Sequence, residues 1–121
     1  MDFIIVGLGG FLGSISRYYI YTLEERIQPQ FPWATLFVNV IGCLIAGLLI
    51  GWTSKNLSEY RQVLLFSLIG FLGAFTTFSA FSVQTLQLIR ANQVLLAVTN
   101  IIISVSLGLM SVWLGTRLTG S

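Results

Sequence analysis

The sequence predicts an all-α membrane protein, a single domain of residues 1–121 that crosses the bilayer four times. Of the 121 residues, 55% are hydrophobic and only 8% are charged, whereas a soluble domain carries about 25% charged residues. A helix needs about 20 apolar residues to cross a bilayer core about 30 Å thick. The chain therefore has room for four spans joined by short loops, and none for a soluble domain.

Four apolar segments are long enough to span, at about residues 3–23, 33–52, 63–89 and 94–118. The polar segments between them are expected to be turns at the membrane surface. Trp33, Trp52 and Trp113 lie near the ends of spans, where indole rings favour the headgroup region. No Lys or Arg precedes the first apolar run, so we interpret it as a retained helix rather than a signal peptide.

Several classes of function are disfavoured by residues that are absent or misplaced. Histidine is absent and Cys43 is the only cysteine, which argues against His/Cys metal sites and disulfides. The four acidic residues fall outside the predicted membrane core, so a small proton-coupled exporter of the multidrug-resistance type lacks its buried carboxylate. An enzyme is also disfavoured, because without histidine or a membrane-embedded acid the chain cannot pair a nucleophile with a base. The scattered basic residues give no support for nucleic-acid binding.

The charges of the loops do not set an orientation. Basic residues normally mark the cytoplasmic side, but here three lie on each side, Lys55, Arg61 and Arg117 against Arg26, Arg90 and Arg17, the last placed near the end of the first span. Two explanations remain open. Either six charges are too few to decide, or the chain inserts in both orientations, which would permit an antiparallel dimer.

Small and polar residues follow one helical face on two spans. At i, i+4, i+7 spacing the second span carries Thr35, Asn39, Gly42 and Ala46, and the fourth carries Asn100, Ser104, Gly108, Ser111 and Gly115. Close helix packing is the commoner role of such a face in membranes. A track that lines an ion pathway is the alternative.

The middle of the third span contains Gly70, Gly73 and the adjacent Thr76 and Thr77. Glycine relaxes a helix and threonine hydroxyls can satisfy freed carbonyls, so we expect a break near mid-membrane. Broken helices at that depth commonly mark ion sites. Phe78 and Phe81 follow on one face, a pair that on its own is more often packing or lipid contact.

Three motifs in order resemble the fluoride channels of the CrcB or Fluc family, over nearly the whole chain. They are Gly9, Gly10, Gly13, Ser16, Arg17 and Tyr18 in the first span, TLFVNVIG at residues 35–42, and GAFTTFSAF at residues 73–81. The resemblance implies an antiparallel, dual-topology homodimer in the bacterial inner membrane. Each of its two pores would be lined by both subunits.

The resemblance also implies roles for single residues. Phe78 and Phe81 would form the aromatic lining of the fluoride pathway, and Asn39 would donate from its amide. Ser79 and Ser104 would add hydroxyls, and Arg17 would attract anions near a vestibule, although an arginine at a helix end can also snorkel to the surface. The backbone carbonyls of Gly73 and Thr76 would bind a structural sodium ion at the dimer centre.

Three positions depart from the family pattern: Ala80 replaces a frequent hydroxyl residue, Gln84 an expected glutamate, and Asn100 a frequent tyrosine.

The implied function is passive export, because hydrogen fluoride enters cells, ionises and is trapped as fluoride. An inside-negative potential contributes about 2.3 kcal/mol per charge for each 100 mV, so a selective pore needs no energy coupling. A non-transporting packing module is the other rival, and it predicts no flux and tolerance of Asn39 substitution.

Overall fold

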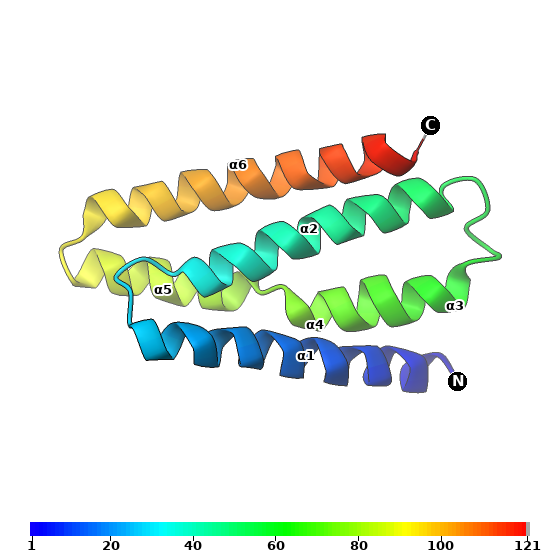
Figure 1. Ribbon diagram of the computed structural model, residues 1–121, viewed down its shortest axis with the longest axis horizontal. Coiled ribbons are helices and arrows are strands. Elements are labelled where there is room, and N and C mark those ends of the chain that lie inside the picture. The colour runs from blue at the N-terminus through cyan, green and yellow to red at the C-terminus, as the bar shows by residue number, and fades with distance from the viewer. Residues whose placement is uncertain (121) are drawn as a thin grey trace.

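The computed structural model describes residues 1–120 as an all-α bundle whose helical segments run side by side along its long axis (Figure 1). Both termini lie at one end of the bundle. In chain order the elements are α1 (Asp2–Ile27), α2 (Trp33–Thr53), α3 (Arg61–Leu64), the π-helix η1 (Leu65–Leu72), α4 (Gly73–Phe75), α5 (Phe78–Arg90) and α6 (Val94–Thr119).

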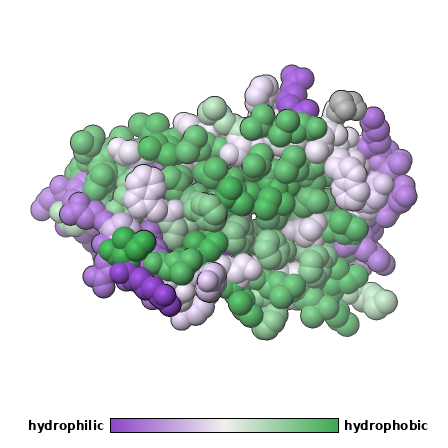
Figure 2. Space-filling view, viewed as in Figure 1, coloured by the Kyte–Doolittle hydropathy of each residue, from purple (hydrophilic) through white to green (hydrophobic). Residues whose placement is uncertain are grey.

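Within residues 1–120, four helical stretches are long and apolar enough to cross a membrane, namely Asp2–Ile27, Trp33–Thr53, Arg61–Arg90 and Val94–Thr119. The four-span prediction is confirmed. Figure 2 shows the corresponding surface pattern, with apolar side chains over most of the visible face and hydrophilic ones gathered toward the two ends. Such a distribution matches a bilayer flanked by water on both sides.

The first helix is longer than the apolar segment that predicts it. It continues to Ile27, four residues past residue 23, and ends where Gln28 adopts the left-handed conformation (φ 49°). Hydropathy marks where apolar residues end, whereas a helix stops where its hydrogen bonding is terminated. Glu24, expected in a surface turn, is helical, and its Oε1 accepts a hydrogen bond from the Ala34 N–H at 2.8 Å. The end of α1 is thereby tied to the start of α2.

Glycines bring α1 into backbone contact with η1. A Cβ added at Gly9 would lie 2.2 Å from the Phe66 carbonyl oxygen, and one at Gly13 would lie 2.1 Å from the Phe71 carbonyl oxygen. No larger side chain fits at either position without moving the helices apart. The wide turns of the π-helix lie along this contact, and π-helical turns often occur near functional sites.

A second glycine contact joins α2 to α6. A Cβ at Gly47 would lie 2.3 Å from the Val112 carbonyl oxygen, and one at Gly115 would lie 2.6 Å from the Leu44 carbonyl oxygen. Gly42, which belongs to the polar face of the second span, instead faces the Thr76 side chain, where a Cβ would lie 2.2 Å from Cγ2. The two faces of α2 therefore have different tasks, since one packs on α6 and the other meets the third span.

Candidate functional site

The helix of the third span is interrupted at Thr76 and Thr77, about half way along the bundle (Figure 1). α4 ends at Phe75, and both threonines have extended backbone, with φ −82° and ψ 156° at Thr76 and φ −153° and ψ 120° at Thr77. The Thr77 hydroxyl accepts a hydrogen bond from the Ala80 N–H at 3.1 Å and caps the start of α5. Helix ends carry backbone groups without helical partners, so they need others.

Asn39, from α2, supplies two of those partners. Its Nδ2 donates to the Thr77 carbonyl at 3.1 Å, and the Thr77 N–H donates to its Oδ1 at 2.7 Å. The side chain thus pairs with both backbone groups of one interruption residue. A primary amide has two N–H donors, so one remains beyond the bond to Thr77.

Arg17 supplies another partner from α1. Its Nη1 donates to the Thr76 carbonyl at 3.3 Å. The sequence placed Arg17 near the end of the first span, and this placement is wrong because α1 continues for ten residues to Ile27. Hydropathy gave the helix end too early, and a long side chain in mid-helix can reach the neighbouring helix. The guanidinium therefore lies at the interruption rather than snorkelling at a helix end.

A cavity of about 410 Å³ lies beside the interruption, and we call it the break cavity. Its lining residues are Ser14, Arg17, Tyr18, Tyr21, Thr77, Ser79, Ala80 and Val83. The hydroxyls of Ser79 and Thr77 are 3.1 Å apart, and either can donate to the other. A guanidinium and several hydroxyls without a carboxylate in the lining are suited to a small anion, which needs donors to replace its water.

Phe78 and Phe81 begin α5 next to this cavity. Their ring centroids are 5.6 Å apart with the planes inclined by 41°. The Phe78 side chain is 79% exposed, whereas Phe81 is half-buried. Because one ring points away from its own bundle, the two rings do not enclose a passage within a single chain.

The polar face of α6 is connected to the helix that carries these rings. Asn100, only 1% exposed, donates from Nδ2 to the Thr85 hydroxyl at 2.9 Å, and Thr85 donates to the Phe81 carbonyl at 2.7 Å. The Ser104 hydroxyl donates to Asn100 Oδ1 at 3.2 Å. Both hydroxyl hydrogens are thus given to protein acceptors. Within one chain this part of the face packs helices together.

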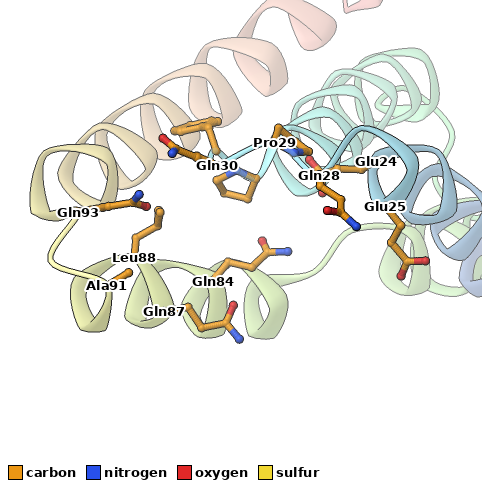
Figure 3. A pocket seen from close by; sticks show the side chains of 12 residues that line it. Glu24, Glu25, Gln28, Pro29, Gln30, Gln84, Gln87, Leu88, Ala91 and Gln93 are labelled. Atoms are coloured by element: carbon orange, nitrogen blue, oxygen red, sulfur yellow. The ribbon is translucent and has the colours of Figure 1, made fainter.

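Another cavity, of about 430 Å³, opens between the α1–α2 loop and α5 and is bordered by Glu24 and Glu25 of α1. Figure 3 shows Gln84 reaching into it from α5 toward the loop that contains Gln28 and Pro29. Gln84 Oε1 is buried and has no hydrogen-bond partner among residues 1–120. With two carboxylates and no basic residue in its lining, this cavity is less suited to an anion than the break cavity is.

The expected sodium ligands, Gly73 and Thr76, fit a cation only in part. The Thr77 N–H, which would reach the Gly73 carbonyl in a continuing α-helix, donates to Asn39 instead, so the Gly73 carbonyl is left without that partner. Carbonyl oxygens suit hard cations, and residues 1–120 hold no group of three His, Cys, Asp or Glu side chains that could replace them. The Thr76 carbonyl, however, already accepts from Arg17.

The structure thus groups Arg17, Asn39, Thr76 and Ser79 around one interruption, while Ser104 belongs to the separate Asn100 network. Sequence reasoning expected the hydroxyls of Thr76 and Thr77 to satisfy freed carbonyls at the break. It did not expect the Thr77 hydroxyl to cap α5 or the Thr77 backbone to pair with Asn39. A threonine just before a helix is a preferred N-cap, and this signal was present. Thr85 was also missed, although its spacing of four from Phe81 is that of a hydroxyl bonding back to a helix carbonyl.

These features define a class, small helical membrane proteins with a polar site at an interrupted helix. The chain belongs to the CrcB family, because the family model described as "CrcB-like protein, Camphor Resistance (CrcB)" matches residues 4–116. It is a multi-pass protein of the bacterial plasma membrane.

Its curated relatives are named fluoride-specific ion channels. FluC of Flavobacterium psychrophilum is 41% identical over 111 residues, which cover 91% of this chain and 90% of the relative. FluC of Methylobacillus flagellatus is 43% identical over 118 residues, 94% and 91% of the two chains. FluC 2 of Rhodococcus jostii is 43% identical over 119 residues, 98% and 99% of the two chains.

Proposed function

We propose that this protein is a fluoride-selective channel that lets fluoride leave the cytoplasm passively. The observation that carries the proposal is the break cavity, in which Arg17 and the Thr77 and Ser79 hydroxyls meet at an interruption in the third span. The names of relatives 41–43% identical to this chain support fluoride as the ion. The proton-coupled exporter receives no support, since the break cavity has no carboxylate in its lining.

Fluoride is small and strongly hydrated, so a pore must replace its water with close donors. The break cavity offers the Arg17 guanidinium and several hydroxyls, among them those of Thr77 and Ser79. Asn39, which lies outside the lining, has one amide N–H beyond the bond to Thr77. Beyond it, Phe78 and Phe81 can present their positive ring edges to an anion while they keep the passage narrow. Chloride is larger and gains less from short hydrogen bonds, which is the physical basis of the expected selectivity.

The channel is further proposed to be an antiparallel homodimer with two pores. Phe78 is 79% exposed on its own bundle, so it could line a pore only if a second chain covers it. With Arg17 at the interruption, Lys55, Arg61 and Arg117 remain on one side against Arg26 and Arg90 on the other. A difference of one charge is too small to fix a single orientation. A two-fold axis near the interruption would give each pore residues from both subunits and place the carbonyls of Gly73 and Thr76 around a shared sodium ion.

The test of conduction uses purified protein in liposomes loaded with potassium fluoride, with valinomycin to carry the compensating current and a fluoride electrode outside. Efflux should be rapid with fluoride and slow when the same liposomes hold chloride and a chloride electrode is used. Protein-free liposomes are the control. Equal efflux of the two anions, or fluoride efflux no faster than in protein-free liposomes, would show that the proposal is wrong.

The test of topology uses a single cysteine in the α2–α3 loop, Ser58→Cys in a Cys43→Ser background. A membrane-impermeant thiol reagent applied to intact cells should label only part of the protein, and lysis should make the rest reactive. Labelling that is complete, or absent, before lysis would mean one orientation and would refute the antiparallel arrangement.

A further inference from the structure

One face of α1 forms a wall of the break cavity. The lining residues on this helix follow the i, i+3, i+4, i+7 spacing of a single helical face, namely Ser14, Arg17, Tyr18 and Tyr21. We propose that the Tyr21 hydroxyl donates a hydrogen bond to the anion in this cavity, and that the buried Thr35 hydroxyl holds it in position. This inference rests on the proposed function and adds a specificity-determining residue to the fluoride site.

The Tyr21 and Thr35 hydroxyls share a hydrogen bond, and the burial of Thr35 determines which of them donates. Their oxygens are 3.0 Å apart, and within residues 1–120 neither hydroxyl makes another hydrogen bond. Two hydroxyls carry two hydrogens, and only one of these lies between the oxygens. Thr35 is 2% exposed, so a hydrogen that pointed elsewhere from Thr35 would be buried without an acceptor. Thr35 therefore donates to Tyr21, and the Tyr21 hydrogen is left for another acceptor.

The break cavity is where that acceptor can bind, because Tyr21 lines it and no carboxylate does. An anion would accept from Tyr21 in a charge-assisted hydrogen bond, which is shorter and about twice as strong as a neutral one. The ring is already held, since it packs against the buried cluster of Val38, Leu72 and Phe75. A donor fixed before binding loses less conformational entropy when the anion arrives. Fluoride should gain more than chloride, because a small anion makes the shorter bond.

The alternative is that the hydroxyl pair only ties α1 to α2. Tyr21→Phe and Thr35→Val each remove the same bond between these helices, so a purely structural pair would make the two variants bind fluoride equally well. A donor to the anion is lost only in Tyr21→Phe, because Thr35→Val keeps the phenol hydroxyl at the cavity. The comparison of the two variants therefore separates the two roles.

The first measurement is fluoride binding to the purified protein in detergent by isothermal titration calorimetry. Tyr21→Phe should weaken fluoride binding about tenfold, the loss expected for one hydrogen bond to a charged group. Thr35→Val should weaken it clearly less, and Thr35→Ser, which restores the donor, should bind like the parent. The matched control is Tyr19→Phe on the same helix, whose side chain is 63% exposed and lies outside the lining; it should also bind like the parent.

The second measurement uses the parent itself, with ¹³C at Cζ of its four tyrosines, and follows their NMR signals as fluoride is added. The Tyr21 signal, identified by replacing each tyrosine in turn with phenylalanine, should shift until fluoride saturates, whereas Tyr19 and Tyr60, outside the lining, should not shift. The same concentration of chloride should leave it in place.

A Tyr21 signal that does not move at saturating fluoride would overturn the inference. Equal fluoride affinity in Tyr21→Phe and Thr35→Val, or parental affinity in Tyr21→Phe, would do the same. Fluoride efflux from liposomes that contain the parent tests the channel function separately. A parent that conducts fluoride while Tyr21→Phe binds it unchanged would refute this inference alone.

Discussion

Asn39→Leu should destabilise the protein more than Asn39→Asp, although aspartate brings a charge and leucine does not. Leucine is similar in size and removes both hydrogen bonds to Thr77. These are the bond from Asn39 Nδ2 to the Thr77 carbonyl at 3.1 Å and the bond from the Thr77 N–H to Asn39 Oδ1 at 2.7 Å. Aspartate keeps the acceptor for the Thr77 N–H and loses only the donor. The order of stability therefore reports which side-chain atoms hold the interruption.

The expected magnitude follows from the backbone groups left unpaired. Thr77 is 9% exposed, so water cannot easily replace a lost partner. Each buried backbone group without a partner costs about 1–3 kcal/mol. The loss per protomer should thus be roughly 2–6 kcal/mol for Asn39→Leu and about half as much for Asn39→Asp.

Unfolding midpoints in detergent measure these losses. Sodium and protein concentration are held fixed, since the stability of the proposed dimer would depend on both. Asn56→Leu, in the exposed loop after α2, is the control for a change of amide to leucine. Fluoride efflux should be lost in both Asn39 variants. If Asn39→Leu melts like the parent, or if Asn39→Asp is the less stable of the two, Asn39 does not hold the interruption in the way described.

Two further predictions concern the pore rings and the glycine contact. Phe78→Ile and Phe81→Ile keep bulk but lose the positive ring edge, so each should slow fluoride efflux about tenfold or more. Each variant should elute like the parent in size-exclusion chromatography, and efflux at the parental rate would contradict the prediction. Gly13→Val places a Cβ 2.1 Å from the Phe71 carbonyl oxygen and should cost about 1–3 kcal/mol or more in denaturant unfolding. Gly7→Val, with nothing within 4 Å of its added Cβ, should change stability little, and equal losses in the two glycine variants would contradict the packing argument.

Hydropathy was sufficient for the four spans because the bilayer sets the length of an apolar helix. It was insufficient for the helix ends, since α1 runs on to Ile27 through polar residues until Gln28 ends it. This error carried over to Arg17, which was counted near a span end but lies at the interruption. The π-helix Leu65–Leu72 had no signal in the sequence, because wide and ordinary turns are built from the same apolar residues.

The sequence predicted which residues belong to the candidate site, but not which contacts they make. The resemblance singled out Arg17 and Asn39, but local patterns cannot reveal partners 59 and 38 positions away along the chain. The sequence also assigned Gly73 to the break, whereas Gly73 is the first residue of α4 and the extended residues are Thr76 and Thr77. A glycine permits an irregular backbone, but here the hydrogen-bond partners determine where it occurs.

The interruption obeys the rule that irregular backbone inside a membrane must be satisfied by protein. All four backbone polar groups of its two residues have partners: the Thr76 N–H bonds Leu72, the Thr76 carbonyl accepts from Arg17, and both groups of Thr77 pair with Asn39. Two of the residues expected in the fluoride pathway therefore also hold the backbone that shapes it. Loss of flux in an Arg17 or Asn39 variant is consequently not evidence that the side chain touches the anion. Only flux measured together with the stability of the protein separates a residue that binds fluoride from one that positions the helices around it.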